Sequence, residues 1–165
     1  MMSPAYFQTF ARYNTWANGL VYDAAAELPD SAYRTPRPAA YFSSLHGTLN
    51  HILVGDRVWM SRFEAVDLGI TSLDKPLFDD FAELRAAREA EDARIERYTA
   101  GLTAEAIAGD LRFRTIVEPK EVSMPLWQTL GHFFNHQTHH RGQAHALLKE
   151  AGIEPPSLDL VHFLR

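Results

Sequence analysis

Five of the eight histidines in this 165-residue chain lie in one short segment, HFFNHQTHHRGQAHALL, at residues 132–148. Histidine is the commonest side-chain ligand of metals in proteins, and its charge changes closer to neutral pH than that of any other side chain. Residues four apart in an α-helix lie on the same face, one turn apart. His132, His136 and His140 have this spacing, so the segment predicts a metal site if it is helical.

The spacing favours His136 and His140 as a pair of ligands. Two imidazoles one turn apart on a helix can reach a common ion, as in helical HxxxH metal sites. His132 and His140 stand roughly 12 Å apart along the helix axis, which is too far for both to bind one ion easily. His139 and His145 point about 100° and about 140° away from His140. We therefore expect a further ligand from another helix.

His51 is the candidate for that further ligand. It lies in the segment LNHILVGDRVW at residues 49–59, and the neighbours Thr48, Gly55 and Val58 are small or apolar. Neutral imidazoles from both helices would leave a divalent ion with at least one open coordination position, which is typical of catalytic rather than structural sites. Such ligands suit zinc, nickel, iron or copper, so the sequence predicts a divalent transition metal without selecting one.

Other polar residues are weaker candidates. His46 lies nearer the start of the same predicted helix as His51. Gln143 points about 20° from His136, so it could form a hydrogen bond to a ligand or contact a substrate. Spacing alone leaves two other interpretations open: a histidine-rich helix that faces solvent, and an ordinary core histidine at position 51.

Three more polar residues allow either a structural or a functional interpretation: Arg141, Asn14 and Asn18. Arg141 follows a candidate ligand. It either holds an anionic substrate or a partner chain, or it forms a surface ion pair. For Asn14 and Asn18 we expect a structural role.

Composition argues against a nucleic-acid partner. The net charge is −5, from 16 basic and 21 acidic residues. Proteins that bind nucleic acids neutralise phosphates with Lys and Arg, and they usually show a basic patch. Here the arginines of one predicted helix alternate with glutamates, and we interpret this pattern as a solvated helix face. These arginines are Arg85, Arg88, Arg94 and Arg97.

The chain contains no cysteine, so it offers no disulfide, no thiolate ligand and no cysteine nucleophile. A thiol in its chemistry would have to come from a small molecule. No apolar run reaches the roughly 18 to 20 residues of a membrane span. The N-terminus lacks the basic and apolar regions of a signal peptide. We therefore expect a cytoplasmic protein with no membrane partner.

Four amphipathic segments must position the candidate residues. Their apolar positions recur at helical spacing over residues 3–28, from Ser43 or Ser44 to Leu68, over 78–101, and from Pro125 to Ala151. Gly69 suits the C-cap of the second helix. Residues 110–124 are rich in β-forming side chains and predict a hairpin. We expect an all-α fold of one domain over residues 1–165: an up-down-type four-helix bundle with a small β-hairpin before the last long helix.

Four motifs follow one another along the chain: YNTWAN at 13–18, LNHILVGDRVW at 49–59, NHQTHHRGQ at 135–143 and PPSLDLVHF at 155–163. In this order they resemble the DinB family (the DinB/YfiT-like metalloenzyme superfamily), and the likeness covers nearly the whole chain. The resemblance implies a four-helix bundle with a divalent metal at His51, His136 and His140, often within a homodimer.

The resemblance also bears on function. Members of the family with an assigned activity include metal-dependent transferases and isomerases that use low-molecular-weight thiols. We therefore expect a metal-dependent enzyme with a small-molecule substrate and such a thiol as cosubstrate. Two alternatives remain open: a metal-dependent hydrolase that uses metal-bound hydroxide, and a non-catalytic, stress-related protein that binds the metal or a ligand.

Overall fold

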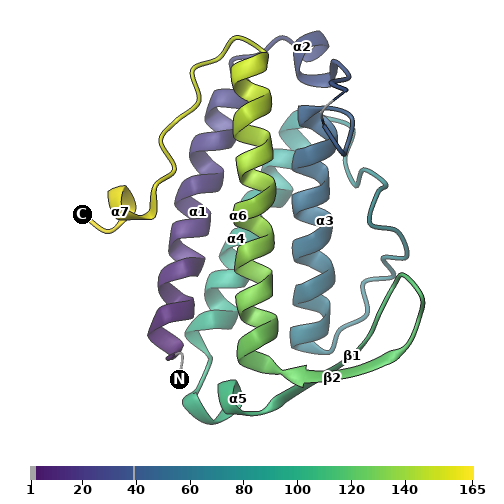
Figure 1. The fold of residues 1–165 in the computed structure, drawn as a ribbon, viewed down its shortest axis with the longest axis vertical. Coiled ribbons are helices and arrows are strands. Elements are labelled where there is room, and N and C mark those ends of the chain that lie inside the picture. Colours follow the sequence, from purple (N-terminus) through teal and green to yellow (C-terminus); the bar gives the residue numbers. More distant parts are fainter. Residues whose placement is uncertain (1–2, 39) are drawn as a thin grey trace.

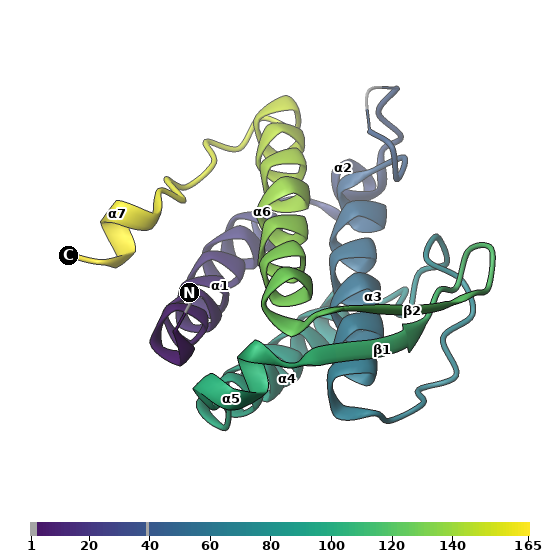
Figure 2. The same cartoon turned by 60° about the horizontal axis from the view of Figure 1, so that its bottom comes forward.

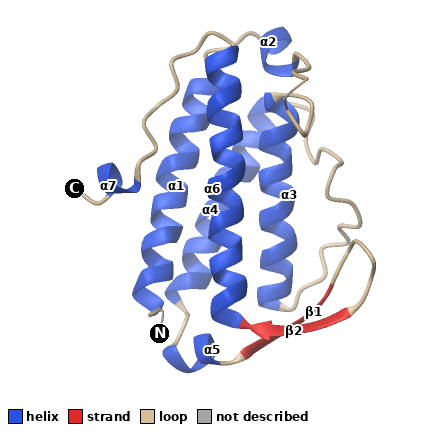
Figure 3. Cartoon of the chain, viewed as in Figure 1, coloured by secondary structure: helices blue, strands red, loops and turns tan. Residues whose placement is uncertain are grey.

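The computed structural model describes residues 3–38 and 40–165. Four long helices form a bundle: α1 (Pro4–Ala26), α3 (Leu45–Glu64), α4 (Phe81–Ala100) and α6 (Leu126–Glu150) (Figure 1). The described residues also form three short helices: α2 (Asp30–Arg34), α5 (Ala104–Ala108) and α7 (Leu160–Phe163). The predicted helical bundle with a small hairpin is confirmed (Figure 3).

The hairpin joins the third long helix to the fourth. Strand β1 (Asp110–Arg114) pairs antiparallel with β2 (Glu121–Pro125), and Phe113 lies opposite Val122. The turned view shows the hairpin extending from the base of α6 across α3 (Figure 2). Its turn, residues 115–120, therefore lies on the side of α3 that faces away from α1.

The long helices do not simply alternate in direction. Helices α1 and α6 run the same way, and α3 and α4 both run the opposite way (Figure 1). The long connection between α3 and α4, residues 65–80, returns along the bundle and makes this parallel pair possible. The closest pairings are the antiparallel ones, α1 with α4 and α3 with α6. The last of these pairs carries the candidate ligands.

Capping residues explain where the helices begin and end. The Ser44 hydroxyl accepts from the Gly47 amide at 3.1 Å, and the Asp80 carboxylate accepts from the Glu83 amide at 2.9 Å. Helix α3 ends at Glu64 rather than at the predicted Leu68. Ala65 takes a left-handed conformation with φ 54°, and the Val66 amide donates to the Ser61 carbonyl at 2.9 Å. This is a Schellman-type end formed without glycine.

Two apolar clusters fill the bundle, one toward each end. One contains Val21, Leu49, Leu84 and Leu148, and the other contains Phe7, Met60, Ile95 and Phe133. Between them every long helix contributes buried polar side chains, here called the polar layer: Asn14, Asn18, Asp56, Arg88, Asp92, Gln137 and Arg141. Within the described ranges, no helix combines the length and the apolar character needed to span a membrane.

The interpretation of Arg88 as part of a solvated face was wrong. Arg88 is only 2% exposed, and its guanidinium lies 2.6 Å from Asp56 and 2.9 Å from Asp92. The alternation of arginine with glutamate is real along α4, but it does not reveal which arginine faces inward. Arg88 faces inward because it pairs with Asp56, which lies on α3 in a distant part of the sequence.

Candidate metal centre

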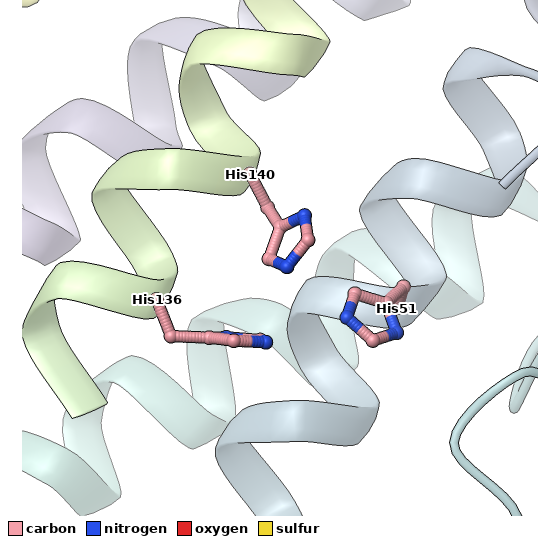
Figure 4. Close-up of side chains that lie close together, drawn as sticks. All are labelled: His51, His136 and His140. Carbon is pink, nitrogen blue, oxygen red and sulfur yellow. The ribbon is translucent and has the colours of Figure 1, made fainter. Parts of the chain in front are cut away.

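Three histidines from two helices converge between α3 and α6. His51 projects from α3, and His136 and His140 project from α6, with their rings turned toward one another (Figure 4). One nitrogen of each ring lies within 4.8 Å of a nitrogen of each of the other two. The ring centroids of His51 and His140 are 4.5 Å apart, and those of His136 and His140 are 4.3 Å apart.

Gly55 makes the space that His136 occupies. A Cβ atom built at position 55 would lie 2.7 Å from Cε1 of the His136 ring, far inside van der Waals contact. Gly55 is one helical turn from His51, so its bare backbone allows the two helices to approach at the level of the cluster. The small residue noted at this position in the sequence thus leaves the space that the His136 ring fills.

Hydrogen bonds determine the tautomers of two of the histidines. Nδ1 of His51 lies 3.0 Å from the carbonyl oxygen of Leu73, which only accepts, so Nδ1 is the protonated nitrogen. Nδ1 of His140 lies 2.8 Å from Oε1 of Gln143 and donates to it in the same way. In both rings the Nε2 lone pair is therefore free to bind a metal ion, the arrangement usual for metal-binding histidines.

His136 is positioned differently. Its Nδ1 atom is buried and has no hydrogen-bond partner among the described residues. Packing against Gly55 and the two neighbouring imidazoles positions this ring instead. Gln143, which lies nearly along the direction of His136, is in contact with His140.

The cluster is electrically neutral at neutral pH. Burial and the neighbouring imidazoles lower the pKa of His136 to about 3. Burial also lowers the pKa of His140 to about 4, although its hydrogen bond to Gln143 acts in the opposite direction. The pKa of His51 is lowered by burial as well. Imidazoles must be deprotonated to bind a metal, and these rings are deprotonated without one.

The donor set fits a divalent transition metal. Three neutral nitrogens would occupy three of the four tetrahedral positions around zinc and leave the fourth open. Nitrogens bound to one zinc ion stand about 3.4 Å apart, given zinc–nitrogen distances of about 2.0 to 2.1 Å. Because the three nitrogens lie within 4.8 Å of one another, the rings would have to move closer together to reach that geometry.

The sequence model of the DinB family matches residues 1–165. The chain belongs to the DinB family. It is 26% identical over 158 residues to the protein DinB of Bacillus subtilis strain 168, an alignment that covers 89% of this chain and 87% of the relative. A crystal structure of a DinB-like protein from Bacillus cereus ATCC 10987 has the same fold. It shares 20% sequence identity and a TM-score of 0.65, and the match covers 90% of this chain and 94% of that one.

The remaining histidines of this DinB-family chain lie outside the cluster. His132 shares the face of His136, but its ring packs 5.0 Å from Trp59. The ring of His139 lies on the outer side of α6, where its Nε2 is 3.3 Å from Gln143. His145 is 3.1 Å from the Pro156 carbonyl, and His46 is 3.3 Å from the Tyr33 hydroxyl. Each of these four has a local structural partner.

Phe42 and Leu73 were not predicted as parts of this site. The ring of Phe42 stacks on His51 with centroids 3.7 Å apart, and it meets His140 edge-on at 5.5 Å. Leu73 contributes only its backbone carbonyl. Both residues lie in loops, and helical periodicity carries no information on how a loop folds back over a helix.

Arg141 is buried rather than at the surface, so the interpretation as a surface ion pair was wrong. It is 2% exposed, and its guanidinium donates to the side-chain oxygens of Asn14 and Asn18. The amide nitrogens of the same two asparagines donate to Asp92, at 3.1 Å and 3.0 Å. The asparagines thus link a buried cation to a buried carboxylate, which agrees with the structural role expected for them.

Proposed function

We propose that this protein is a metal-dependent enzyme that holds one divalent ion of zinc, nickel or iron through His51, His136 and His140. Its reaction would be a transfer or an isomerisation with a low-molecular-weight thiol as cosubstrate. The observation that supports this most directly is the convergence of three neutral imidazoles, two of them with a free Nε2 lone pair. An ion bound there would act as a Lewis acid and lower the pKa of a coordinated thiol.

The side chains around the cluster prepare it for this chemistry. Leu73 and Gln143 hold the rings of His51 and His140 by their Nδ1 atoms and leave the Nε2 atoms directed inward. Phe42 covers one face of His51, which restricts water on that side. Since the chain has no cysteine, the thiol must be supplied by a small molecule.

The test of the proposal combines metal analysis with thiol binding. Protein purified without an affinity tag should contain close to one divalent ion per chain. Titration of a cobalt-substituted sample with a low-molecular-weight thiol should produce a thiolate-to-metal charge-transfer band. His51→Ala should abolish both signals, and His145→Ala, on the outer part of α6, should retain both.

Other outcomes of the same experiment would support a different function. A metal-loaded sample with no thiol band, but with a hydrolysis rate that rises near neutral pH, would indicate a hydrolase. A sample that shows neither the thiol band nor hydrolysis, but whose thermal stability rises with a ligand, would indicate a binding protein. A sample that binds no divalent ion would contradict both the thiol-dependent enzyme and the hydrolase.

We also propose a cytoplasmic homodimer. The reducing cytoplasm keeps low-molecular-weight thiols in the reduced form that the reaction requires. The dimer is supported by the family resemblance and by exposed apolar side chains, among them Tyr6, Trp127 and Leu164. Sedimentation of a monomer at micromolar concentration would contradict the dimer without affecting the metal centre.

A further inference from the structure

A pocket of about 390 Å³ lies beside the metal centre. Its walls come from segments far apart in the sequence: the loop before α3, the return connection after α3, and the turn of the hairpin. Residues from these segments that line the pocket include Tyr41, Phe42, Ser72, Leu73 and Val117. The return connection and the hairpin turn run beside each other along α3 (Figure 1).

His51 belongs to both the pocket and the histidine cluster. Phe42 lines the pocket as well, and its ring stacks on His51. A molecule in the pocket would therefore lie against His51 and one side chain away from the other two imidazoles. A larger cavity of about 530 Å³ shares the wall formed by Tyr41, Phe42 and Asp74, but none of the cluster histidines lines it.

The walls are aromatic and aliphatic, with hydroxyl groups between them. The rings of Tyr41 and Phe42 meet edge-on with centroids 4.8 Å apart. Tyr41 is 83% exposed and Val117 is 70% exposed, so two large apolar side chains stand open at the rim. A bound apolar molecule would cover this surface, which is the usual source of affinity in small-molecule pockets.

The charge of the pocket is one-sided. Among its described lining residues there is no lysine or arginine, and Asp74 provides a carboxylate. The Asp74 backbone amide donates to the Ser72 hydroxyl oxygen at 3.3 Å, which leaves the hydroxyl hydrogen of Ser72 available to a ligand. A carboxylate at the rim repels an anionic ligand and does not weaken the binding of an uncharged one.

We propose that this pocket binds the second substrate of the reaction and that this substrate is an uncharged, largely apolar molecule about the size of a substituted benzene. The inference rests on the proposed function, since it places this molecule next to the thiol cosubstrate. Tyr41 and Val117 provide the apolar contact surface. Asp74 weakens the binding of anions of the same shape.

A matched pair of probes tests the proposal by binding alone. Methyl 4-nitrophenyl sulfone is uncharged, and 4-nitrobenzenesulfonate is an anion of similar size and a weak metal ligand. On metal-free protein, where no bound ion attracts the sulfonate, calorimetric titration should show the sulfone binding up to about fivefold more tightly. The reason is that repulsion between the Asp74 carboxylate and a sulfonate at an exposed site is worth up to about 1 kcal/mol. Backbone amide NMR signals of Ser72, Leu73 and Val117 should shift with the sulfone.

Variants separate the contributions of shape and charge. Tyr41→Ala should weaken the sulfone about fivefold to tenfold through the lost aromatic contact. Asp74→Asn should tighten the sulfonate severalfold and leave the sulfone unchanged. The matched control is Pro76→Ala, since Pro76 lines only the larger cavity and should leave both affinities unchanged. Equal binding of the two probes, or NMR shifts confined to other regions, would overturn the proposal.

The result is independent of the test of the proposed function. Sulfone binding without a thiol charge-transfer band would retain the pocket and remove the thiol-dependent reaction. A thiol band without sulfone binding at Ser72 and Val117 would retain the reaction and overturn the pocket. Loss of both signals in Tyr41→Ala would place Tyr41 in the folding of the site and would overturn its role as a substrate contact.

Discussion

At the scale of single residues, the two helices contribute to the histidine cluster in different ways. His136 and His140 follow from helical geometry alone, because four residues make about one turn whatever the helix packs against. The partnership with His51 depends on how α3 packs on α6, which periodicity does not specify. The small or apolar neighbours of His51, and its position further from the helix start, favoured it over His46, and the resemblance of whole motifs then supported that choice.

The first prediction separates His132 from its neighbour one turn away. His136→Ala should reduce the metal content to near zero, because it removes one nitrogen from the cluster. His132→Ala should retain close to one ion per chain, since its ring packs on Trp59 outside the cluster. Metal analysis of the two purified variants measures this difference. Equal loss in both would move the site one turn toward the start of α6.

The second prediction concerns Gly55. Gly55→Ala places a methyl group 2.7 Å from the present position of the His136 ring, so the ring must move away from the other two. We expect a metal affinity at least about tenfold lower, in the range seen when a residue that orients a ligand is lost. Gly131→Ala is the control, because a Cβ there meets no atom within 4 Å. Unchanged affinity in Gly55→Ala would show that the ring has another position from which it can bind.

At the scale of helices, the polar layer joins α1, α3, α4 and α6 through contacts among charged and amide side chains. Arg88 on α4 lies between Asp56 of α3 and Asp92 of its own helix. Burial raises the pKa of both aspartates, and the Arg88 charge acts in the opposite direction. The four charged groups of the layer are two arginines and two aspartates, so the layer as a whole is neutral.

The third prediction tests this layer. Asp56→Ala removes one of the two carboxylates beside Arg88 and leaves a buried cation incompletely paired. We expect a loss of about 3 kcal/mol in the free energy of unfolding, the usual consequence of breaking a buried pair. The control is Arg85→Ala, which removes exposed pairs with Asp23 and Glu89 and should change stability by less than about 1 kcal/mol. Urea unfolding measures both values, and a small effect of Asp56→Ala would contradict the assigned role.

The ends of the helices show what local signals can and cannot predict. Ser44 was one of the two predicted starting points of the second helix, whereas Asp80 caps a helix that was predicted to begin at residue 78. The end of α3 was placed at Gly69 because glycine is the usual residue for a left-handed cap. Ala65 takes that conformation instead, and Gly69, with φ 64°, turns the chain further along. The earlier end frees residues 65–80 for the long return past His51.

At the scale of the whole molecule, the number and length of the long helices were predictable from apolar periodicity. Their directions were not. A connection as long as residues 65–80 can join two helices in either relative direction, whereas a short one forces them to be antiparallel. The parallel pair α3 and α4 therefore became evident only from the structure (Figure 1).

The fourth prediction concerns the stability of the metal-free protein as a function of pH. The pKa values of His136 and His140 in the fold are about 3 and about 4, below their ordinary value of 6.5. At a pH between these lowered pKa values and about 6.5, the unfolded chain binds more protons than the folded one. These histidines therefore make the stability of the fold decrease as the pH falls below about 6.5. Asp56, with a pKa raised to about 6, contributes in the opposite direction.

A comparison of variants isolates the histidine contribution. The free energy of unfolding in urea would be measured without metal at about pH 7.5 and about pH 5, for the wild type and for His136→Gln. The carboxylates are the same in both proteins, so the wild type should lose more stability on acidification. An equal or smaller loss in the wild type would contradict the low pKa of His136 in the fold.

The position of the ligands along the chain has a consequence for unfolding. His51 and His136 are far apart in sequence, and an ion shared between them would close a large loop of the polypeptide. In secreted proteins a disulfide closes such a loop and stabilises the fold by reducing the number of conformations open to the unfolded chain. This chain has no cysteine with which to form one. A shared ion would act as a reversible crosslink, and acid or a chelator could release it without any redox reaction.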